Sequence, residues 1–230
     1  QQRPDRPPDR GADGVRIVVF GATGGTGRAV LARALEEGHA VTAFVRDAAK
    51  LAPAEGLTVV EGDAMRAADV AGALAGQDAI VVALGNPQGA LARLAGARRR
   101  TPRDVCEVGT RHIVEALPPD SRIPIVVVSA FGVGATRDKL PFAYKLFYRL
   151  ILREQIEDKE RQEALLARTR LDYVLVQPAA LTDAPGRGTW TASTEGALGR
   201  TEVSREDLAA FILRMLADGI PSRRTIAFSG

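Results

Sequence analysis

Apolar residues along this chain form short runs that alternate with segments of helical spacing. The runs are rich in β-branched residues and have the length of strands, whereas the intervening segments place apolar residues three or four positions apart. Strands are expected at residues 15–20, 40–47, 57–61, 79–85, 123–132 and 172–180. Helices are expected at residues 29–37, 69–74, 103–117, 140–170 and 204–216. Strands that alternate with helices predict an α/β fold.

The two ends of the chain have weaker patterns. Residues 189–193 and 200–204 are expected to form a small strand pair over a ligand cleft, and residues 225–228 an edge strand. Ser204 is expected to cap the last helix, because Asp207 lies at its third position in an arrangement close to a capping box. The first fourteen residues are rich in Pro, Arg and Asp and lack an apolar core. A disordered tail is therefore expected before a single domain at residues 15–230.

A glycine-rich turn joins the first strand to the first helix. Its residues are Gly21, Thr23, Gly24, Gly25, Thr26 and Gly27. Glycine allows a tight turn and a close approach to a ligand, and the helix after it presents unpaired N–H groups to a phosphate. The glycine spacing, at positions 21, 24 and 27, differs from the common G-x-G-x-x-G form. A turn without a ligand is the alternative, but the flanking strand and helix favour a site for a dinucleotide pyrophosphate.

The second strand ends in a cation. Arg46 lies where NAD-binding proteins commonly place an acidic residue that holds the ribose hydroxyls. This cation favours the 2′-phosphate of NADP(H), and Lys50 offers a second positive charge to the same group. A solvated pair of loop cations is the alternative, and Asp47 leaves NAD(H) open because its carboxylate could reach a ribose hydroxyl.

Polar and small residues follow other strands at what should be the same edge of the sheet. Asp63 either accepts a hydrogen bond from an adenine amino group or forms a plain turn. Gly85 ends the fourth apolar run where a cofactor would pass, and Ser129 brings a hydroxyl to the same edge. Lys159 lies in the charged half of the long helix and either approaches this site or is solvated.

Composition narrows the possible chemistry. The chain has 31 Lys and Arg against 28 Asp and Glu, and its net charge of +3 is too small and dispersed to indicate a nucleic-acid partner. No run is long enough to span a membrane, so a cytoplasmic location is expected. Cys106 is expected to be a buried structural thiol, and His39 and His112 are too few for a histidine metal cluster. These exclusions favour an enzyme whose cofactor carries the reaction.

Two further features have more than one interpretation. The arginines Arg98–Arg100 either meet an anion or form a solvated loop. The apolar half of the long helix, Phe142–Ile151, lines a pocket, contacts a second subunit or packs on the core.

Together these motifs resemble the atypical short-chain dehydrogenases/reductases with an NmrA-like fold, and among them the flavin reductase, or biliverdin-IXβ reductase, branch. The resemblance rests on Gly21–Gly27, Val45–Asp47, Gly62–Asp63, Leu84–Gly85, Ser129–Phe131, Gln177–Pro178 and Ser204–Leu208. It extends from about Val15 to Phe228, and its most specific part is the glycine motif. The resemblance implies a doubly wound, mostly parallel Rossmann-type sheet with a small C-terminal substrate-binding region.

The resemblance also implies roles for individual residues. Besides the glycine motif at the pyrophosphate, these are Arg46 and Lys50 at the 2′-phosphate, Asp63 and Ala64 at the adenine, and Leu84, Gly85, Pro178 and Ala179 around the nicotinamide and its ribose. Ser129 corresponds to the active-site serine of the family, and Lys159 is the second catalytic candidate. The segments that follow Gly85 and Phe131 are longer than in the flavin reductase branch, which leaves the acceptor unidentified.

The tyrosine–lysine pair of standard short-chain dehydrogenases is missing. None of Tyr144, Tyr148 and Tyr173 has a lysine four residues later, which disfavours the interconversion of alcohols and ketones. The leading hypothesis is an NADPH-dependent reductase, a monomer or weak homodimer, that transfers hydride to a planar conjugated acceptor of flavin, quinone or tetrapyrrole type. The alternatives are a regulatory protein that senses NADP(H) without turnover and an NADP-dependent isomerase or epimerase.

Overall fold

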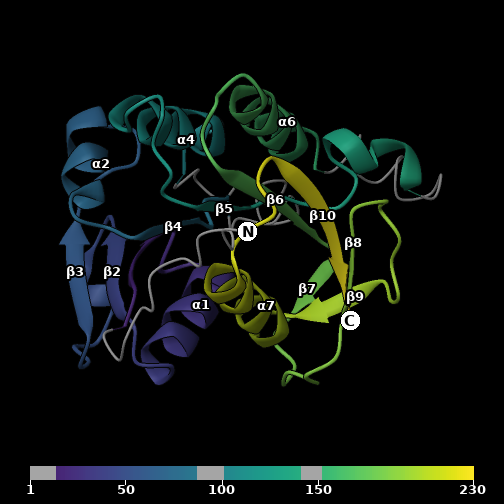
Figure 1. Ribbon diagram of the computed structural model, residues 1–230, viewed down its shortest axis with the longest axis horizontal. Coiled ribbons are helices and arrows are strands. Elements are labelled where there is room, and N and C mark those ends of the chain that lie inside the picture. Colours follow the sequence, from purple (N-terminus) through teal and green to yellow (C-terminus); the bar gives the residue numbers. More distant parts are fainter. Residues whose placement is uncertain (1–13, 87–100, 141–151) are drawn as a thin grey trace, which may run out of the picture.

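An eight-stranded sheet runs through the centre of the computed structural model, which describes residues 14–86, 101–140 and 152–230 (Figure 1). The strands lie in the order β3-β2-β1-β4-β5-β6-β10-β8. Their bounds are β1 Arg16–Phe20, β2 Ala40–Val45, β3 Leu57–Glu61, β4 Ala79–Val82, β5 Ile125–Val128, β6 Tyr173–Pro178, β8 Thr191–Ser193 and β10 Arg224–Ser229. Neighbouring strands are parallel except β8, which runs antiparallel to β10. The predicted α/β class with a doubly wound, mostly parallel sheet is confirmed.

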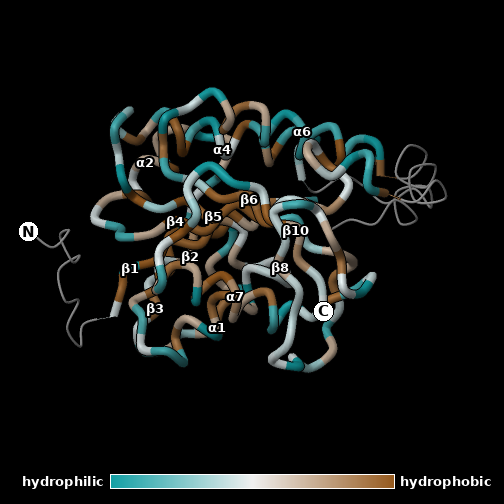
Figure 2. Tube along the Cα trace, turned by 45° about the vertical axis from the view of Figure 1, so that its right-hand side comes forward, coloured by the Kyte–Doolittle hydropathy of each residue, from teal (hydrophilic) through white to brown (hydrophobic). Residues whose placement is uncertain are grey.

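Helices cover both faces of this sheet (Figure 2). One face carries α1 Gly25–Glu36 and α7 Arg205–Asp218, and the other carries α2 Ala67–Leu74, α4 Val105–Ala116 and α6 Arg153–Ala167. Two 3-10 segments, η1 Ala48–Lys50 and η2 Gly134–Lys139, lie in connections. Side chains of β1 alternate between the layers, so that Ile17 packs with α1 and α7 and Val18 with the opposite layer. Burial on both faces explains why the central strands are apolar throughout.

The sheet order reverses beside β1. From β1 the chain builds outward to β2 and β3, and then returns to β4 on the other side of β1 before it continues to β5 and β6. At such a reversal a crevice opens outside the carboxyl ends of the strands, and ligands of open α/β sheets bind there. The glycine turn follows β1 at this point.

The predicted pairing of the small C-terminal strands is wrong. Residues 191–193 form β8, in which Ser193 lies opposite Ala227 of β10. Residues 202–204 form β9, Glu202–Ser204, which pairs in parallel with β7, Ala180–Thr182. Segments of three residues carry too short a pattern to select a partner from sequence. Their partners are set by the strands beside them, because β7 continues the chain directly beyond β6.

The strand β10 is an interior strand, contrary to the prediction of an edge. It lies between β6 and β8, with Phe228 opposite Pro178 on one side and Ala192 on the other. Ala227 and Phe228 are buried, as the two-sided cover of an interior strand requires. The sequence pattern does not separate the two cases, because a short apolar run is compatible with either position.

The helix expected at residues 140–170 is described only in its second half. Here α6 begins at Arg153, and Leu140 follows η2 outside any helix. The segments Phe142–Ile151 and Arg98–Arg100 lie outside the described residues, so their interpretations stay predictions. At the start of α7, Ser204 Oγ accepts a hydrogen bond from Asp207 N at 2.9 Å, and the predicted cap is confirmed.

Candidate functional site

The glycine turn after β1 is shaped by close backbone packing. Gly21 has a φ of 83°, in the region that side chains disfavour, and a Cβ there would lie 2.5 Å from Ala83 O. A Cβ on Gly27 would lie 2.1 Å from Gly21 O. Gly27 therefore lets α1 approach the turn and does not itself line the cleft.

The N-terminus of α1 has features that fit a phosphate. Its cap residue is Gly24, no side chain caps its first N–H groups, and its first turn carries no acidic residue. At the start of α4, in contrast, a side chain of the protein takes this place: the Asp158 carboxylate accepts from Cys106 N and Glu107 N at 3.0 and 2.9 Å. The open amides and the positive end of the α1 dipole therefore suit the pyrophosphate of a dinucleotide.

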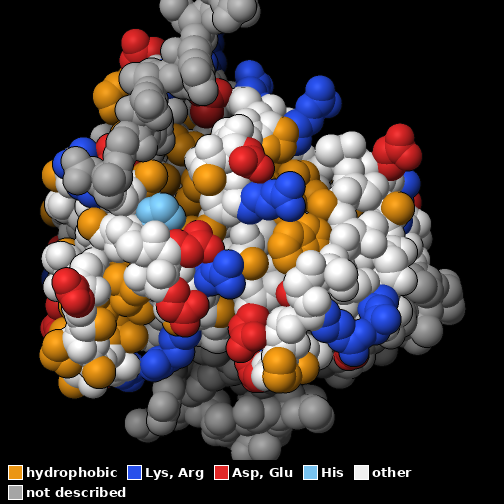
Figure 3. Space-filling model, turned by 60° about the horizontal axis from the view of Figure 1, so that its bottom comes forward, with side chains coloured by type: hydrophobic (Ala, Val, Ile, Leu, Met, Phe, Trp, Pro, Cys, Tyr) orange, Lys and Arg blue, Asp and Glu red, His pale blue; other side chains and the backbone are white. Residues whose placement is uncertain are grey.

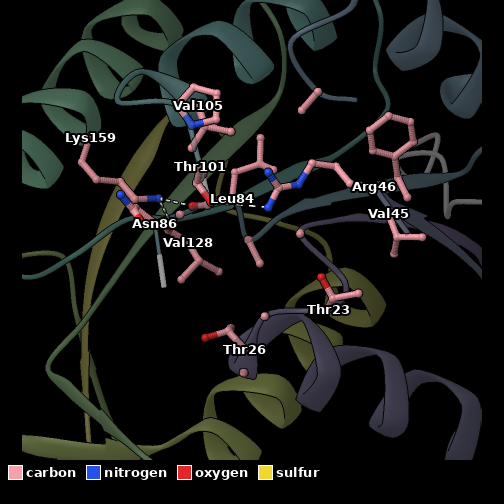
Figure 4. A pocket seen from close by; sticks show the side chains of 18 of the residues that line it. Thr23, Thr26, Val45, Arg46, Leu84, Asn86, Thr101, Val105, Val128 and Lys159 are labelled. Carbon is pink, nitrogen blue, oxygen red and sulfur yellow. Dashed lines mark hydrogen bonds between the residues drawn. The ribbon is translucent and has the colours of Figure 1, made fainter. Parts of the chain in front are cut away.

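A cleft of about 360 Å³ follows the carboxyl ends of the strands (Figure 4). Most predicted site residues line it: Gly21, Thr23, Gly24, Gly25, Thr26, Arg46, Asp63, Ala64, Leu84, Gly85, Ser129 and Lys159. The predicted residues that do not line it are Gly27, Lys50, Pro178 and Ala179. Parallel strands end at one edge of the sheet, which is why residues so distant in sequence meet here.

Arg46 lines the part of this cleft that lies beyond the end of β2. It extends from the end of β2 toward Thr101, and its Nη2 donates to Thr101 Oγ1 at 3.4 Å (Figure 4). Asp47 is engaged elsewhere: its Oδ1 accepts from Ala49 N at 3.2 Å, and Lys50 Nζ lies 3.5 Å from its carboxylate. The cation of this strand end lines the cleft, whereas the neighbouring carboxylate caps η1.

Asp63 forms a turn at the edge of the same cleft. Its Oδ1 accepts from Met65 N, and its own N–H donates to Asp69 Oδ2, both at 3.0 Å. His112 of α4 contacts the residue after Asp63, since its Nδ1 lies 2.9 Å from Ala64 O. The turn interpretation is thus confirmed, and the predicted contact with adenine stays a prediction for a side chain that also lines the cleft.

Ser129 is joined to a buried polar network at the other end of the cleft. Ser129 Oγ donates to Glu163 Oε1 at 2.5 Å, and Gln177 Nε2 donates to the same oxygen at 2.8 Å. Gln177 Oε1 in turn accepts from Thr136 Oγ1 at 2.7 Å. These four residues are all buried and come from β6, α6, η2 and the segment after β5. The network fixes the Ser129 hydroxyl at the wall of the cleft.

Lys159 ties two strand ends together. Its ammonium donates to Leu84 O at 2.9 Å, to Val128 O at 2.6 Å and to Gln162 Oε1 at 3.2 Å. An ammonium has three donors, and each of them has an acceptor within the protein. Lys159 lines the cleft, but its hydrogen bonds show that it holds together the backbone at the carboxyl ends of β4 and β5.

Cys106 and Pro178–Ala179 act as internal supports. Cys106 is buried, its Sγ donates to Leu84 O at 3.3 Å, and burial raises the pKa of the thiol to about 12, so the predicted structural role is confirmed. Pro178 O accepts from Phe131 N at 3.0 Å, and Ala179 N donates to Phe228 O at 2.8 Å. These backbone bonds hold the end of β6 beside the Ser129 segment.

Sequence reasoning missed Arg205 and Glu163. Arg205 lies at the start of α7 and packs against the glycine turn, since a Cβ on Gly25 would lie 2.6 Å from Arg205 Nε. Its Nη1 donates to Asp183 Oδ1 at 2.6 Å, and Asp183 is exposed. Arg205 lies within the Ser204–Leu208 segment, where it was assigned no role, and Glu163 stands in no recognisable motif. Both reach the site from elements far along the chain. Only the packing of α7 beside α1 and of α6 beside α4 brings them there.

The described residues give no indication of a metal or of a membrane span. Within the described ranges, no group of three His, Cys, Asp or Glu side chains is placed to hold a metal ion. No helix in this part of the chain has the length and apolar character needed to cross a membrane. On the face shown in Figure 3, Lys and Arg side chains are interspersed with Asp and Glu. The net charge of +3 is therefore not gathered into one basic surface on that face.

Known proteins share this fold and parts of this sequence. An uncharacterized chloroplastic protein of Arabidopsis thaliana is 27% identical over 208 residues, which cover 87% of this chain and 71% of that protein. An anaerobillin reductase from Escherichia coli O157:H7 superposes with a TM-score of 0.74 at 23% identity, with 93% of this chain and 96% of that chain covered. A short-chain dehydrogenase/reductase from Veillonella parvula DSM 2008 in complex with NADP gives 0.75 at 17% identity, with 94% of each chain covered.

At these identities the solved structures establish a common fold, in agreement with the predicted resemblance to atypical short-chain dehydrogenases/reductases. A sequence profile described as NAD(P)H-binding matches residues 21–219. The matched region begins at Gly21 in the turn after β1 and ends at Gly219, which follows α7. It contains the glycine turn, Arg46, Ser129 and the helices that support them, and the chain therefore belongs to the NAD(P)H-binding family.

Proposed function

We propose that this protein is an NADPH-dependent reductase that transfers hydride to a planar conjugated acceptor. The observation that supports this proposal most directly is one cleft lined by Arg46, the open N-terminus of α1 and Ser129. Bound NADPH would supply the hydride. The protein residues would bind the phosphates, hold the reactive ring near Ser129 and exclude water, which is mainly a task of positioning.

The preference for NADPH over NADH is supported by the end of β2. Arg46 lines the cleft, and the Asp47 carboxylate is engaged by Ala49 N and Lys50. Arg46 would exchange its bond to Thr101 for the 2′-phosphate, which a guanidinium binds with several donors. Lys50 would contribute only through its charge at the rim, because it does not line the cleft.

Arg205 would add a cation to the pyrophosphate site. A positive charge beside the positive end of α1 is unfavourable until an anion lies between them. The guanidinium of Arg205 lies against Gly25 at this place, and the exposed carboxylate of Asp183 is its partner. A phosphate at the turn would satisfy both the open amides of α1 and Arg205.

The test is oxidation of NADPH by the purified protein with a panel of flavins, quinones and linear tetrapyrroles. We expect saturable oxidation with at least one of these classes, and a slower rate with NADH. Binding of NADPH without acceleration by any acceptor would contradict the proposal. The variant S129A separates cofactor binding from turnover. It should lower turnover while the Kd for NADPH changes by less than about twofold.

A regulatory protein that senses NADP(H) without turnover is the second candidate. The observation that favours it is Lys159, whose three donors are all engaged within the protein and which therefore offers no proton to a substrate. It predicts tight NADPH binding, no turnover and a protein partner whose association depends on the redox state of the cofactor. Turnover by the purified chain would remove this candidate.

A further inference from the structure

Glu163 is a carboxyl group buried directly behind the cleft. It is 8% exposed, and its Oε1 lies 2.5 Å from the oxygen of Ser129, which itself lines the cleft. Its other oxygen lies beside Gly134, where a Cβ would come within 2.2 Å of Oε2. Gly134 thus leaves room for the whole carboxyl group. The hydrogen bond to Ser129 joins this carboxyl group to a residue that lines the cleft.

Among the residues that the structure describes, no cation is in contact with Glu163. From β6, Gln177 donates an uncharged N–H to Oε1. From its own helix, the ammonium of Lys159 donates to two carbonyls and to Gln162, and Glu160 is paired with Arg137 of η2. A buried carboxylate without a contacting cation is costly, and binding a proton relieves that cost.

We propose that Glu163 is a neutral carboxylic acid at rest and supplies, through Ser129, the proton that the acceptor needs after hydride transfer. This inference rests on the proposed function, in which the acceptor is a conjugated molecule whose nitrogen or oxygen becomes basic once it has gained a hydride. Ser129 is the catalytic residue, since it touches the acceptor. Glu163 acts through Ser129 and is a positioning residue that also stores the proton.

The step balances in protons and electrons. Bound NADPH would supply the hydride, which carries two electrons and would form a new C–H or N–H bond on the acceptor. For this step the Ser129 hydroxyl turns from Glu163 to the acceptor, and Glu163 carries its proton on Oε1, the oxygen next to Ser129 Oγ. The O–H bond of Ser129 then breaks, its proton goes to the negative heteroatom of the acceptor, and Ser129 Oγ takes the proton of Glu163 Oε1. The products are the oxidised dinucleotide, the reduced acceptor and the Glu163 carboxylate, which water reprotonates before the next turnover.

The electrostatics of Glu163 agree with this role. Burial raises the pKa of the Glu163 carboxyl above its ordinary value, although the hydrogen bonds from Ser129 and Gln177 and the charge of Lys159 act in the opposite direction. A carboxylic acid with a raised pKa retains its proton closer to neutral pH, where it can serve as a general acid.

The first test uses the protein without cofactor or acceptor. Infrared difference spectra over a pH titration should show a protonated carboxyl C=O band that persists above the ordinary range of glutamate and is absent in E163Q. The matched control is E157Q, which removes a carboxyl earlier on α6 that pairs with Arg153, outside the network of Ser129, and should keep the band. The inference would be overturned if the Glu163 carboxyl lost its proton within the pH range that is ordinary for glutamate.

The second test measures turnover with the best acceptor found for the wild type. E163Q keeps an oxygen that accepts from Ser129 and Gln177, so folding and the Kd for NADPH should be preserved, while kcat falls by about 100-fold. The wild-type rate should decrease as the pH rises through the raised pKa and show a solvent deuterium isotope effect. Both features should disappear in E163Q and persist in E157Q.

Ser129 and Glu163 should also behave as one unit. The double variant S129A/E163Q is expected to be no slower than the slower single variant, because each change breaks the same relay. Equal pH profiles and isotope effects in wild type and E163Q, with turnover intact, would overturn the relay and leave the reductase standing. No turnover in the wild type, despite NADPH binding, would overturn the proposed reductase and the relay with it.

Discussion

Arg46 is the residue that we propose discriminates between NADPH and NADH. In R46A we expect the KM for NADPH to rise roughly tenfold or more, because a hydrogen bond to a charged group contributes about 1.5–3 kcal/mol. The KM for NADH should change by less than about twofold, since NADH has no 2′-phosphate for the guanidinium to bind. Steady-state kinetics with both cofactors and one acceptor measures the difference.

The control for this change is R33A, which removes an exposed arginine of α1 that pairs with Glu37 outside the cofactor cleft. It lowers the net charge equally and should leave both KM values unchanged. A similar rise for NADPH and NADH in R46A would show that Arg46 supports the cleft without recognising the 2′-phosphate.

Glu163 should make the stability of the protein depend on pH. Its pKa is raised in the folded state, so between the ordinary value, about 4.3, and the raised value the folded chain holds a proton that the unfolded chain has lost. This contribution is fully present below the ordinary pKa and is lost as the pH rises through the folded one, by at most about 1.4 kcal/mol per pH unit. Urea unfolding at several pH values should show this decline in wild type relative to E163Q; parallel curves would contradict it.

At the residue scale, the sequence is most informative where function follows from position on a strand end. Ser129 and Arg46 could be placed because each follows an apolar run, and parallel strands deliver their carboxyl ends to one edge. Glu163 could not, because a charged residue in a charged helix carries no sign of its long-range partner in β6. Lys159 was placed at the cleft, but its engagement by Leu84 O and Val128 O depends on backbone atoms that no sequence pattern encodes.

Asp158 connects two helices by capping one from the other. D158A would leave Cys106 N and Glu107 N at the start of α4 without their acceptor in a buried site, at a cost of about 2 kcal/mol or more. D158N retains one oxygen and should cost less. Chemical unfolding measures both, and E157Q, an exposed change on the same helix, is the control. A loss below about 0.5 kcal/mol in D158A would show that water replaces the carboxylate.

At the element scale, the sequence located long and short strands, but it did not predict how the short ones pair. The runs that became β1, β2 and β3, and the capped helix α7, carry periodicity or a cap that identifies them. The three-residue strands β8 and β9 carry neither, and they pair with β10 and β7 only because those strands lie beside them.

The strand β10 holds the C-terminal half of the sheet together. Phe228 is fully buried and stacks on Phe211 of α7 with ring centroids 4.6 Å apart. F228A should cost about 3–5 kcal/mol of the free energy of unfolding, because the cavity would lie between the sheet and α7. R224A, an exposed change on the same strand, is the control. Thermal unfolding of both variants measures this difference. If F228A lost as little stability as R224A, the result would contradict a continuous core between β10 and α7.

At the scale of the whole molecule, the alternation of strands and helices predicted the class of fold, and the glycine turn marked the edge of the sheet where the candidate site lies. The order of the last strands was not predictable, because β10 pairs with β6 and β8 across long separations that leave no local trace.

The place of β10 has a consequence for how the chain is made. The strands β1, β2 and β3 neighbour each other in sequence and in the sheet, so they can pair while later residues are still being translated. In contrast, β6 and β8 acquire their common neighbour only when Ser229 has left the ribosome. Until then the open edge of β6 is exposed, and this half of the nascent chain is where chaperones would have to act.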